Sequence, residues 1–474
     1  MNNRRTRTRV SSYGGVYPVP IYVAPQSCGG KCVFCPKAQD FPSSYIRNSD
    51  TLFAHEVGFS ASLQLHRFLS QIPQNPQSQG VPLEIIVLGG SFSALSVEYR
   101  LRFTRDLYEA MIGHSCHDRR DLEESLYRCS ILTVESRPDQ ITQRECDFLR
   151  YLGVSKVEIG AQHFKNDILE QCSRGHDCDA IRSATRLLKR NGFKVGYHVM
   201  LGLPGSTYDD DLRMLTVDLW TPEFSPDFLK VYPCVLLRDL SYQPALHSLY
   251  KSGKWAPPSR EYLASLLERL FNAIPPYVRV SRIQRQFPLG ALLGGYVGSL
   301  RNETETSCKC VRCREAGKVC PDRPLDEMGH VYLRKTKVGL DKHFELLTQN
   351  DMLVALARTY ESTSSISLLR EIHVYGKARA LGTPGQVQGR GLGEFLLKMI
   401  ENDVHKCGQD TLRIHAAFGV KGFFRRHGYT EDESGFLSKH VNERNTATLS
   451  RDSASYEIAA ISAETSSGSY ALTQ

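Results

Sequence analysis

The sequence predicts an α/β protein in which a partial (β/α) barrel precedes a cysteine-rich loop and a second, smaller α/β domain. Short apolar runs of β type alternate with helical patterns from Tyr22 to about Arg282, and a new β-then-α pattern runs from Tyr332 to about Val441. Alternating strands and helices favour parallel βαβ units, and strands this apolar are buried on both faces. The 474 residues are enough for about three domains at roughly 100–200 residues each.

The expected strands of the first domain are six short apolar segments, and each is followed by a turn or a helical pattern. They end at Gly90, Ser136, Gly160, Gly202, Cys234 and Arg282. One of the intervening helices covers residues 180–191, with Asp179 as its expected N-cap and Gly192 as its C-terminal stop.

Changes in composition divide the chain into five segments. A basic arm precedes the first domain, a polar cysteine-rich linker separates the two domains, and a Ser/Thr/Ala-rich tail, expected to be disordered, follows the second. The expected segments are 1–21 for the arm, 22–299 for the barrel domain, 300–331 for the linker, 332–442 for the second domain and 443–474 for the tail.

The net charge of +8 is unevenly spread along the chain. Basic residues gather in the first nine residues and again after Tyr277. Clusters of this kind create local positive fields that attract polyanions, most often phosphate backbones, although a solvated basic face is an equal alternative on charge alone. The candidate RNA-binding residues are Arg4, Arg5, Arg7, Arg9, Arg279, Arg282, Arg285, Lys309 and Arg312.

The cysteines and the apolar segments indicate the compartment. No stretch approaches the roughly 18 apolar residues of a membrane span, which predicts a soluble protein without a membrane partner. Seven of the 14 cysteines lie in two short groups, and no secretory signal peptide is recognisable. Clustered cysteines of this kind indicate metal chemistry in a reducing compartment, and we expect a cytoplasmic protein.

The first cysteine group reads CGGKCVFC and contains Cys28, Cys32 and Cys35. Three thiolates on one loop can hold three irons of a [4Fe–4S] cluster and leave the fourth iron open to another ligand. With Phe34 before the last cysteine and Pro36 after it, the loop resembles the radical S-adenosylmethionine (radical SAM) superfamily, in which SAM chelates the open iron. A zinc site remains the alternative, although it needs a fourth ligand.

Other residues fit a SAM site because they lie at or near the C-terminal ends of expected strands, where βα barrels carry their chemistry. A glycine turn ends the strand at Gly90, as in the radical SAM superfamily, and single polar residues follow other strands. The candidate SAM-binding residues are Gly89, Gly90, Ser91, Glu135, Gln162 and His198.

The second cysteine group, CKCVRCREAGKVC, is suited to tetrahedral zinc. Cys308, Cys310 and Cys313 are the expected ligands, and Cys320 is the local candidate for the fourth position. Unligated cysteines in a basic loop are the alternative.

The second domain carries a glycine loop that resembles the acyl-CoA loop of the GNAT acetyltransferases. The loop follows the expected strand REIHVYG and precedes an amphipathic helix, so backbone N–H groups at the helix N-terminus can bind a pyrophosphate. The candidate acetyl-CoA-binding residues are Gln388, Gly389, Arg390, Gly391, Leu392 and Gly393, with His373 and Glu371 as further polar contacts.

The order of radical SAM domain, basic zinc loop and GNAT domain resembles the catalytic subunit of Elongator, the tRNA uridine acetyltransferase family, and the short spacing of the first cysteines resembles its bacterial single-chain members. The resemblance covers residues 6–441 through segments such as CGGKCVFCP, YHVMLGLPGS, LKVYP and QGRGLG. It implies that a 5′-deoxyadenosyl radical takes hydrogen from acetyl-CoA and that the acetyl group becomes carboxymethyl on carbon 5 of the wobble uridine.

The same resemblance implies catalytic roles and partners. Lys230 and Tyr232 in LKVYP are the expected catalytic residues. The expected partners are the anticodon stem-loop of tRNA, acetyl-CoA and an electron donor for the cluster. A homodimer or accessory subunits remain open.

One departure from the family concerns the GNAT domain. Phe423 and Phe424 stand where the family has paired tyrosines, which removes a proton donor that acyl transfer can use. The two phenylalanines favour one alternative hypothesis, a non-catalytic tRNA-binding scaffold that has lost acyl transfer. The other alternative is a protein lysine acetyltransferase in which the cluster is only structural.

Overall fold

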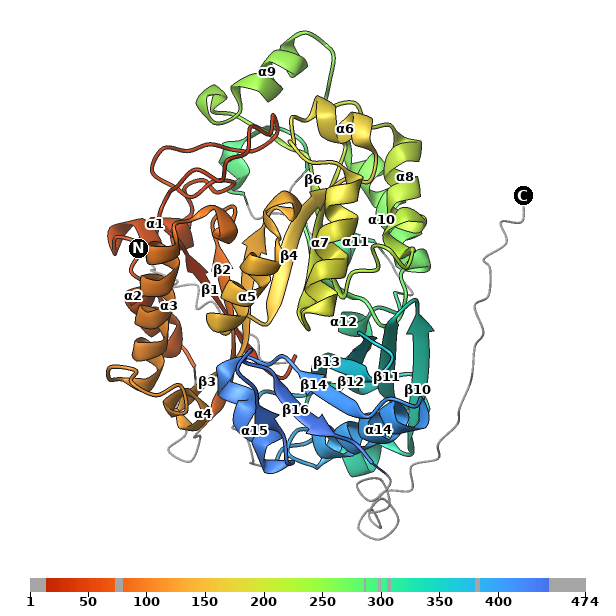
Figure 1. The fold of residues 1–474 in the computed structure, drawn as a ribbon. Helices are drawn as coiled ribbons and strands as arrows, with labels where there is room; N and C mark the ends of the chain where they lie inside the picture. The colour runs from red at the N-terminus through yellow and green to blue at the C-terminus, as the bar shows by residue number, and fades with distance from the viewer. Residues whose placement is uncertain are drawn as a thin grey trace, which may run out of the picture.

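The computed structural model describes residues 14–72, 80–284, 287–296, 298, 300–304, 308–379 and 384–442. Figure 1 shows the two α/β domains stacked on each other, with the N-terminal barrel above the C-terminal domain. Arg4, Arg5, Arg7, Arg9 and Arg285 and the tail lie outside the described residues. None of the described helices combines the length and the apolar character that crossing a bilayer requires.

The first domain is a curled parallel sheet in the order β1-β2-β3-β4-β5-β6-β8, so the predicted partial barrel is confirmed. All six predicted strands are present. The strands are β1 (Tyr17–Tyr22), β2 (Val81–Leu88), β3 (Tyr127–Ser136), β4 (Lys156–Gln162), β5 (Lys194–Leu201), β6 (Phe228–Pro233) and β8 (Arg279–Ile283).

Strand β1 lies partly inside the segment that the sequence assigned to the basic arm. Its sequence YPVPIY contains Pro18 and Pro20, which remove two N–H groups on one side of the strand. Such a strand can only stand at a sheet edge, and β1 pairs only with β2.

Helices cover the outer face of the barrel. Their apolar faces pack on the strands to form a continuous core that includes Leu107, Leu188 and Leu267. The helices of this domain are α1 (Ser49–Glu56), α2 (Ala61–Leu69), α3 (Val97–Ile112), α4 (Asp121–Glu124), α5 (Gln143–Tyr151), α6 (Asn166–Gln171), α7 (Cys178–Arg190), α8 (Tyr208–Thr216), α9 (Pro244–Lys251) and α10 (Arg260–Ala273). Helix α9 lies apart from the others, above the barrel in Figure 1, and belongs to a separate apolar cluster.

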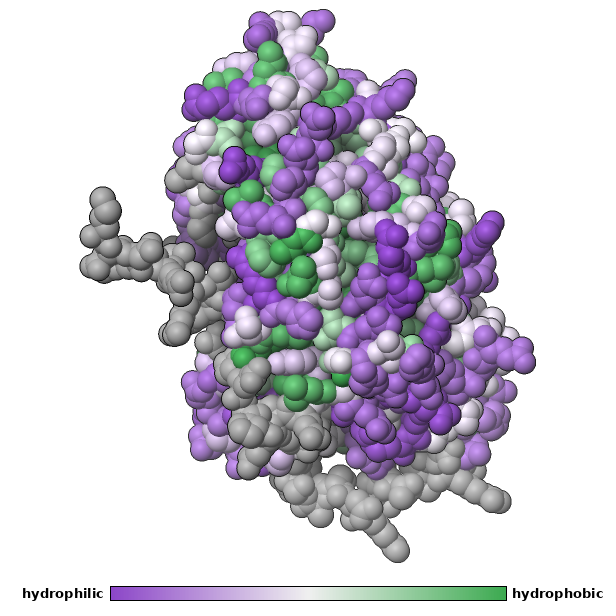
Figure 2. Space-filling model, turned by 90° about the vertical axis from the view of Figure 1, so that its left-hand side faces the viewer, coloured by the Kyte–Doolittle hydropathy of each residue, from purple (hydrophilic) through white to green (hydrophobic). Residues whose placement is uncertain are grey.

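The face that carries α2 and α3 is mostly hydrophilic, with apolar residues in small separate groups (Figure 2).

The linker contributes α11 (Leu300–Glu303), α12 (Val311–Arg314) and α13 (Ala316–Val319), and a small antiparallel pair joins β7 (Leu236–Leu237) to β9 (Leu292–Gly294).

The second domain is a mixed sheet in the order β10-β11-β12-β13-β14-β16-β15. Strands β13 and β14 are parallel, whereas the other pairs are antiparallel. Its elements are β10 (Val331–Val338), β11 (Asp341–Thr348), β12 (Leu353–Glu361), β13 (Ile366–Val374), α14 (Leu392–Lys406), β14 (Thr411–Ile414), α15 (Lys421–Arg426), β15 (Thr430–Glu431) and β16 (Leu437–His440).

Both apolar contacts and buried ions join the domains. Phe418 of the second domain belongs to the barrel core. The next residue must be glycine, because a β-carbon at Gly419 would lie 2.7 Å from backbone atoms of Cys129. Arg370 on β13 ion-pairs with Asp227 before β6 and with Asp341 on β11, at 2.6 Å in each case. These contacts fix the C-terminal domain beneath the barrel.

Candidate active site

The first cysteine loop lies against the glycine turn that ends β2. A β-carbon at Gly30 would lie 3.4 Å from the sulfur of Cys28 and 3.5 Å from that of Cys32, so these two sulfurs flank one small residue. A β-carbon at Gly90 would lie 3.6 Å from Cβ of Cys28. Both expected parts of the SAM site are therefore adjacent.

Two arginines place positive charge beside this loop. Arg174 donates from Nη1 to the sulfur of Cys32 at 3.1 Å, and Arg137 donates from Nη2 to the carbonyl oxygen of Arg174 at 2.7 Å. Nη1 of Arg137 is buried, has no hydrogen-bond partner among the described residues, and would lie 2.8 Å from a β-carbon at Gly30. Cationic donors stabilise thiolate sulfur, so the loop fits an anionic iron–sulfur cluster.

A buried network of charges lies inside the barrel, on strands β3 to β6. His198 donates to Glu158 at 3.1 Å and lies 3.9 Å from Glu135, while Lys230 pairs with Glu158. The ring of Tyr232 packs edge-on against His198, with 5.5 Å between the ring centroids. The structure thus brings together Glu135, His198, Lys230 and Tyr232, which the sequence proposed for the site.

Burial alone would raise the pKa of Glu158, but Lys230 and Lys156 hold it well below its usual range. Burial, together with Lys230, lowers the pKa of His198. Glu158 is therefore a carboxylate and His198 a neutral imidazole near pH 7. Glu135, Glu158 and His198 lie close enough to hold a metal ion, but the two lysines already balance the charge of Glu158.

The remaining proposed SAM contacts lie at the same edge of the sheet. Gln162 ends β4 with a φ of 67°, a left-handed conformation that is uncommon for a residue other than glycine. Ser91 hydrogen-bonds to Gln140, and the backbone N–H of Arg137 donates to its Oγ at 3.2 Å. Ser91 thus ties the glycine turn to the segment after β3.

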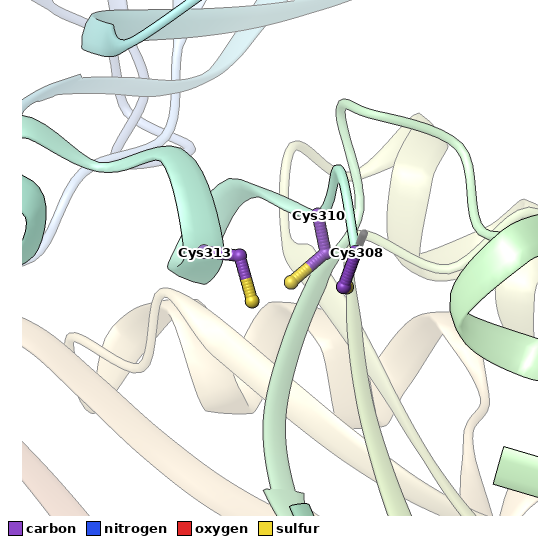
Figure 3. A group of neighbouring side chains, drawn as sticks. All are labelled: Cys308, Cys310 and Cys313. Carbon is purple, nitrogen blue, oxygen red and sulfur yellow. The ribbon is translucent and has the colours of Figure 1, made fainter. Parts of the chain in front are cut away.

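The second cysteine group converges in the linker. The sulfurs of Cys308, Cys310 and Cys313 lie within 4.8 Å of one another, and Figure 3 shows Cys310 and Cys313 pointing toward each other. Cys320 is not part of this group and packs against the core of the second domain. Three thiolates at this spacing fit one zinc ion, and no fourth ligand joins them among the described residues.

A cavity of about 420 Å³ lies between the domains around the glycine loop. Gly391 is the N-cap of α14 with a φ of 80°, so the N–H groups of the first turn face this region. Of the proposed acetyl-CoA contacts, Gln388, Gly389, Gly391, Leu392, Gly393, Glu371 and His373 line the cavity. Arg390 instead donates to the carbonyl oxygen of Gly385 at 2.9 Å.

The N-terminal segment crosses one wall of this cavity. His373 donates from Nε2 to the carbonyl oxygen of Gly14 at 2.6 Å, and Gln388 donates to that of Gly15 at 3.0 Å. Gly15 has a φ of 88°, and a β-carbon there would lie 2.5 Å from Nε2 of Gln388. The two side chains proposed for acetyl-CoA therefore hold this segment.

Phe423 and Phe424, which stand where the family has paired tyrosines, both line the cavity. Tyr429 does not replace them, because its buried hydroxyl donates to Glu401 at 2.7 Å. No tyrosine of the described chain lines the cavity, so His373 and His415 are its only imidazole or phenol groups there.

The proposed RNA-binding residues differ in their surroundings. Arg282 and Lys309 are exposed. Arg279 is ion-paired through both nitrogens with Glu315, and Arg312 donates to the carbonyl oxygen of Ser281 at 2.9 Å. The positive charge of Arg279 is therefore already compensated within the linker.

Sequence reasoning did not assign Arg137, Arg174 or Lys194 to the site. Each is brought there by a contact between distant segments, such as the pairing of Arg174 with Cys32. The order of residues in a sequence carries no signal for such a contact, although the segments ESRPD and RGHD do contain the two arginines.

Comparison with known proteins agrees with this architecture. The model of the Radical SAM superfamily matches residues 22–216, and that of the Acetyltransferase (GNAT) domain matches residues 339–443. The chain thus combines a radical SAM domain with a GNAT domain.

Curated proteins are similar to this chain over most of their own length. A tRNA uridine(34) acetyltransferase of Dehalococcoides mccartyi is 31% identical over 90% of this chain and 98% of its own length. One of Methanocaldococcus jannaschii is 30% identical over 91% and 86%, and human Elongator complex protein 3 is 28% identical over 89% and 83%. The chain belongs to the family of tRNA uridine(34) acetyltransferases and Elongator complex protein 3.

A solved structure supports the same fold. The archaeal Elp3 of Methanocaldococcus infernus is similar with a TM-score of 0.75 and 26% identity, over 90% of this chain and 99% of that one.

Proposed function

We propose that this enzyme modifies the wobble uridine of tRNA, using SAM and acetyl-CoA to place an acetyl-derived carboxymethyl group on carbon 5. The observation that carries the proposal is that one chain holds both required sites. A loop with three cysteines lies against the glycine turn that follows β2 of the barrel, and a glycine-loop cavity lies between the barrel and the GNAT domain.

Cys28, Cys32 and Cys35 would hold a [4Fe–4S] cluster, and Gly89, Gly90, Ser91, Glu135, Gln162 and His198 would surround SAM. A cluster held there would supply the electron that SAM cleavage requires, and an external electron donor would replace that electron. Arg174 would stabilise the thiolate of Cys32 through the hydrogen bond to its sulfur.

Lys230 and Tyr232 would face the reacting groups from β6. Lys230 remains an ammonium because Glu158 raises its pKa against the effect of burial. It would therefore orient an acceptor oxygen and would not act as a base. Neutral His198 can exchange a proton with a ligand at this position.

Acetyl-CoA would bind with its pyrophosphate at the N-terminus of α14, on Gln388, Gly389, Arg390, Gly391, Leu392 and Gly393. His373 would join them once it leaves the carbonyl oxygen of Gly14. Cys308, Cys310 and Cys313 would hold a structural zinc ion in the linker.

The anticodon stem-loop would lie over the open end of the barrel. Arg282 pairs in register with Lys230 on the neighbouring strand, so its exposed guanidinium lies beside the proposed catalytic residues. Lys309 and Arg312, the arm residues Arg4 to Arg9 and Arg285 would extend this surface. We place the activity in the cytoplasm, and a homodimer or accessory subunits are compatible with it.

The test is mass spectrometry of wobble nucleosides from cells that lack this protein. The carboxymethyl-derived modification should disappear and return with the wild-type gene. It should not return with a variant in which Cys28, Cys32 and Cys35 are alanine. Normal modification in the deleted strain would overturn the proposal.

Two measurements on the purified protein separate the alternatives. A lysine acetyltransferase would acetylate peptides without SAM or reductant. A tRNA-binding scaffold, which Phe423 and Phe424 favour, would bind tRNA without producing 5′-deoxyadenosine.

A further inference from the structure

Lys194 reaches the acetyl-CoA cavity from the other domain. It is the first residue of β5 in the radical SAM sheet, and its side chain lines the cavity around the glycine loop of the GNAT domain. The residue is only 6% exposed. A buried amine that faces a cavity is a group available to a ligand.

The other buried lysines of the described chain all have partners. Lys156 pairs with Glu84 at 3.0 Å and Lys189 pairs with Asp341 at 2.6 Å. Lys230, Lys342 and Lys421 also bind carboxylates.

No hydrogen bond or ion pair joins the Nζ of Lys194 to any residue in the described part of the chain. Burial lowers its pKa, although the nearby charge of Glu371 opposes the shift. The amine opens onto the cavity, so a ligand there can complete the bonding that the described chain does not supply.

The position of Lys194 within the cavity follows from the sheet of the GNAT domain. Strands β13 and β14 pair only from Ile366 to Leu369 and from Thr411 to Ile414, and then separate. The cavity lies between the separated segments, with residues 370–374 on one side and 415–417 on the other. The glycine loop and the N-terminus of α14 stand beside the far end of β13, because Gln388 donates to the carbonyl oxygen of Val374 at 3.0 Å.

Lys194 enters near the point where the strands diverge. Its neighbour Phe193 accepts a hydrogen bond from Arg370 at 3.1 Å. Burial lowers the pKa of His415, and the nearby charge of Lys194 adds a small part to that shift. Arg370 and His415 are the first residues beyond the paired part of each strand. A ligand whose pyrophosphate binds at α14 would extend along β13 toward this end.

We propose that Lys194 belongs to the acetyl-CoA site and that its Nζ donates a hydrogen bond to the thioester carbonyl oxygen. The proposal rests on the assignment of the cavity to acetyl-CoA. The radical SAM domain then completes the site of the GNAT domain, so that the acyl end of the ligand is held at the domain boundary. Lys194 is a ligand-contacting residue here, and no bond is made or broken in its role.

The test compares acetyl-CoA with S-ethyl-CoA, which lacks the carbonyl oxygen, on the full-length, cluster-loaded protein by calorimetric titration. Wild-type protein should prefer acetyl-CoA. Lys194→Met should weaken acetyl-CoA binding about tenfold or more, as expected for a hydrogen bond to a charged donor, with little change for S-ethyl-CoA.

Thermal unfolding without ligand gives an independent readout. Lys194→Met should keep or raise the melting temperature, because it removes an amine that burial penalises and that has no carboxylate partner in the described chain. Lys189→Met is the matched control. It should lower the melting temperature by leaving Asp341 short of a counter-charge, while keeping the preference for acetyl-CoA.

Equal weakening of both ligands, or no weakening, in Lys194→Met would overturn the carbonyl contact. A lowered melting temperature with an unchanged ligand preference would show a structural lysine instead. If the wild-type protein binds neither ligand, the acetyl-CoA assignment itself fails, and the contact with it.

Discussion

Single side chains define the chemistry that the cysteine loop can support. Arg174 is the closest cation to a proposed cluster ligand, with 3.1 Å between its Nη1 and the sulfur of Cys32. Its Nη2 also donates to the carbonyl oxygen of Gly160, so the guanidinium is held between β4 and the loop. A fixed donor of this kind stabilises the reduced, more negative state of an iron–sulfur cluster.

Arg174→Leu should therefore shift the midpoint potential of the cluster to a more negative value. The measurement is a redox titration followed by electron paramagnetic resonance, with iron content confirming that the cluster is present. Arg182→Leu on α7 is the control, because that half-exposed arginine pairs with Asp179 and Glu223. An unchanged potential in Arg174→Leu would show that the hydrogen bond does not tune the cluster.

Whole elements explain why we propose the glycine loop as an anion site. Helix α14 begins at Leu392 with Gly391 as a left-handed N-cap and ends before Gly408, which also has a positive φ of 75°. A β-carbon at either glycine would meet nothing within 4 Å. The two positions thus share the same backbone strain and the same open space, but they lie at opposite ends of the helix dipole.

Gly391→Glu should weaken acetyl-CoA binding by about tenfold or more, since the new carboxylate competes for the positive end of the helix and adds bulk in the cavity. Gly408→Glu should lower the stability of the protein about as much as Gly391→Glu does, but it should leave the affinity for acetyl-CoA unchanged. Titration calorimetry measures the first effect and thermal unfolding the second. Equal affinities for the two variants would remove the pyrophosphate from this loop.

The elements also show how far the sequence could be interpreted. The parallel strands were predictable because each is a nearly continuous apolar run. The helix from Cys178 begins two residues before the expected start, and Asp177, not Asp179, is its N-cap. Both residues suit this position, and only the fold decides which backbone is extended there. Strand β1 was missed because its two prolines argue against a strand anywhere except at an edge.

The candidate site was predictable where local spacing determines it, as in the cysteine loop and the glycine loop. It was not predictable where distant segments meet. Cys320 is near the other linker cysteines in sequence but packs into the second domain. Lys194 and Arg174 were not assigned because their neighbours in the site are far away along the chain.

At the scale of the molecule, a buried ion network joins the two domains. Asp227 is 1% exposed and contacts Arg370 and Arg358, while Arg370 also binds Asp341. Burial alone would raise the pKa of Asp227, but Arg370 and Arg358 hold it far below its ordinary value. The stability from this group is present above the unfolded pKa of about 3.9 and is lost as the pH falls through the folded value.

Arg370→Met should cost about 3–5 kcal/mol of unfolding free energy at pH 8, because it leaves buried carboxylates short of a counter-charge. The sign of the pH effect should also reverse. In the variant, burial is less well opposed and the pKa of Asp227 in the folded state rises. The difference in unfolding free energy between the variant and the wild type should therefore shrink as the pH is lowered toward 5. Chemical denaturation at several pH values measures this, and a constant deficit would exclude an electrostatic cause.

The binding of tRNA also belongs to the whole molecule, because the proposed surface spans the barrel and the linker. Arg279 and Arg282 lie on the same short strand, β8, but only Arg282 is exposed, whereas Arg279 binds Glu315. Arg282 is close enough to Tyr232 and Tyr45 to interact with them electrostatically. A phosphate beside a wobble base at Tyr232 would therefore meet Arg282 first.

Arg282→Gln should weaken tRNA binding. It should also reduce the slope of log K against log salt concentration by about 0.7–0.9, the value for one lost phosphate contact. Arg279→Gln, its neighbour on β8, should instead lower the melting temperature and keep the wild-type salt slope, because it breaks the ion pair with Glu315. Filter binding of tRNA between low and moderate salt measures both slopes. If Arg282→Gln keeps the wild-type slope, the phosphate backbone does not lie over this end of the barrel, and the tRNA must approach from the linker or the arm.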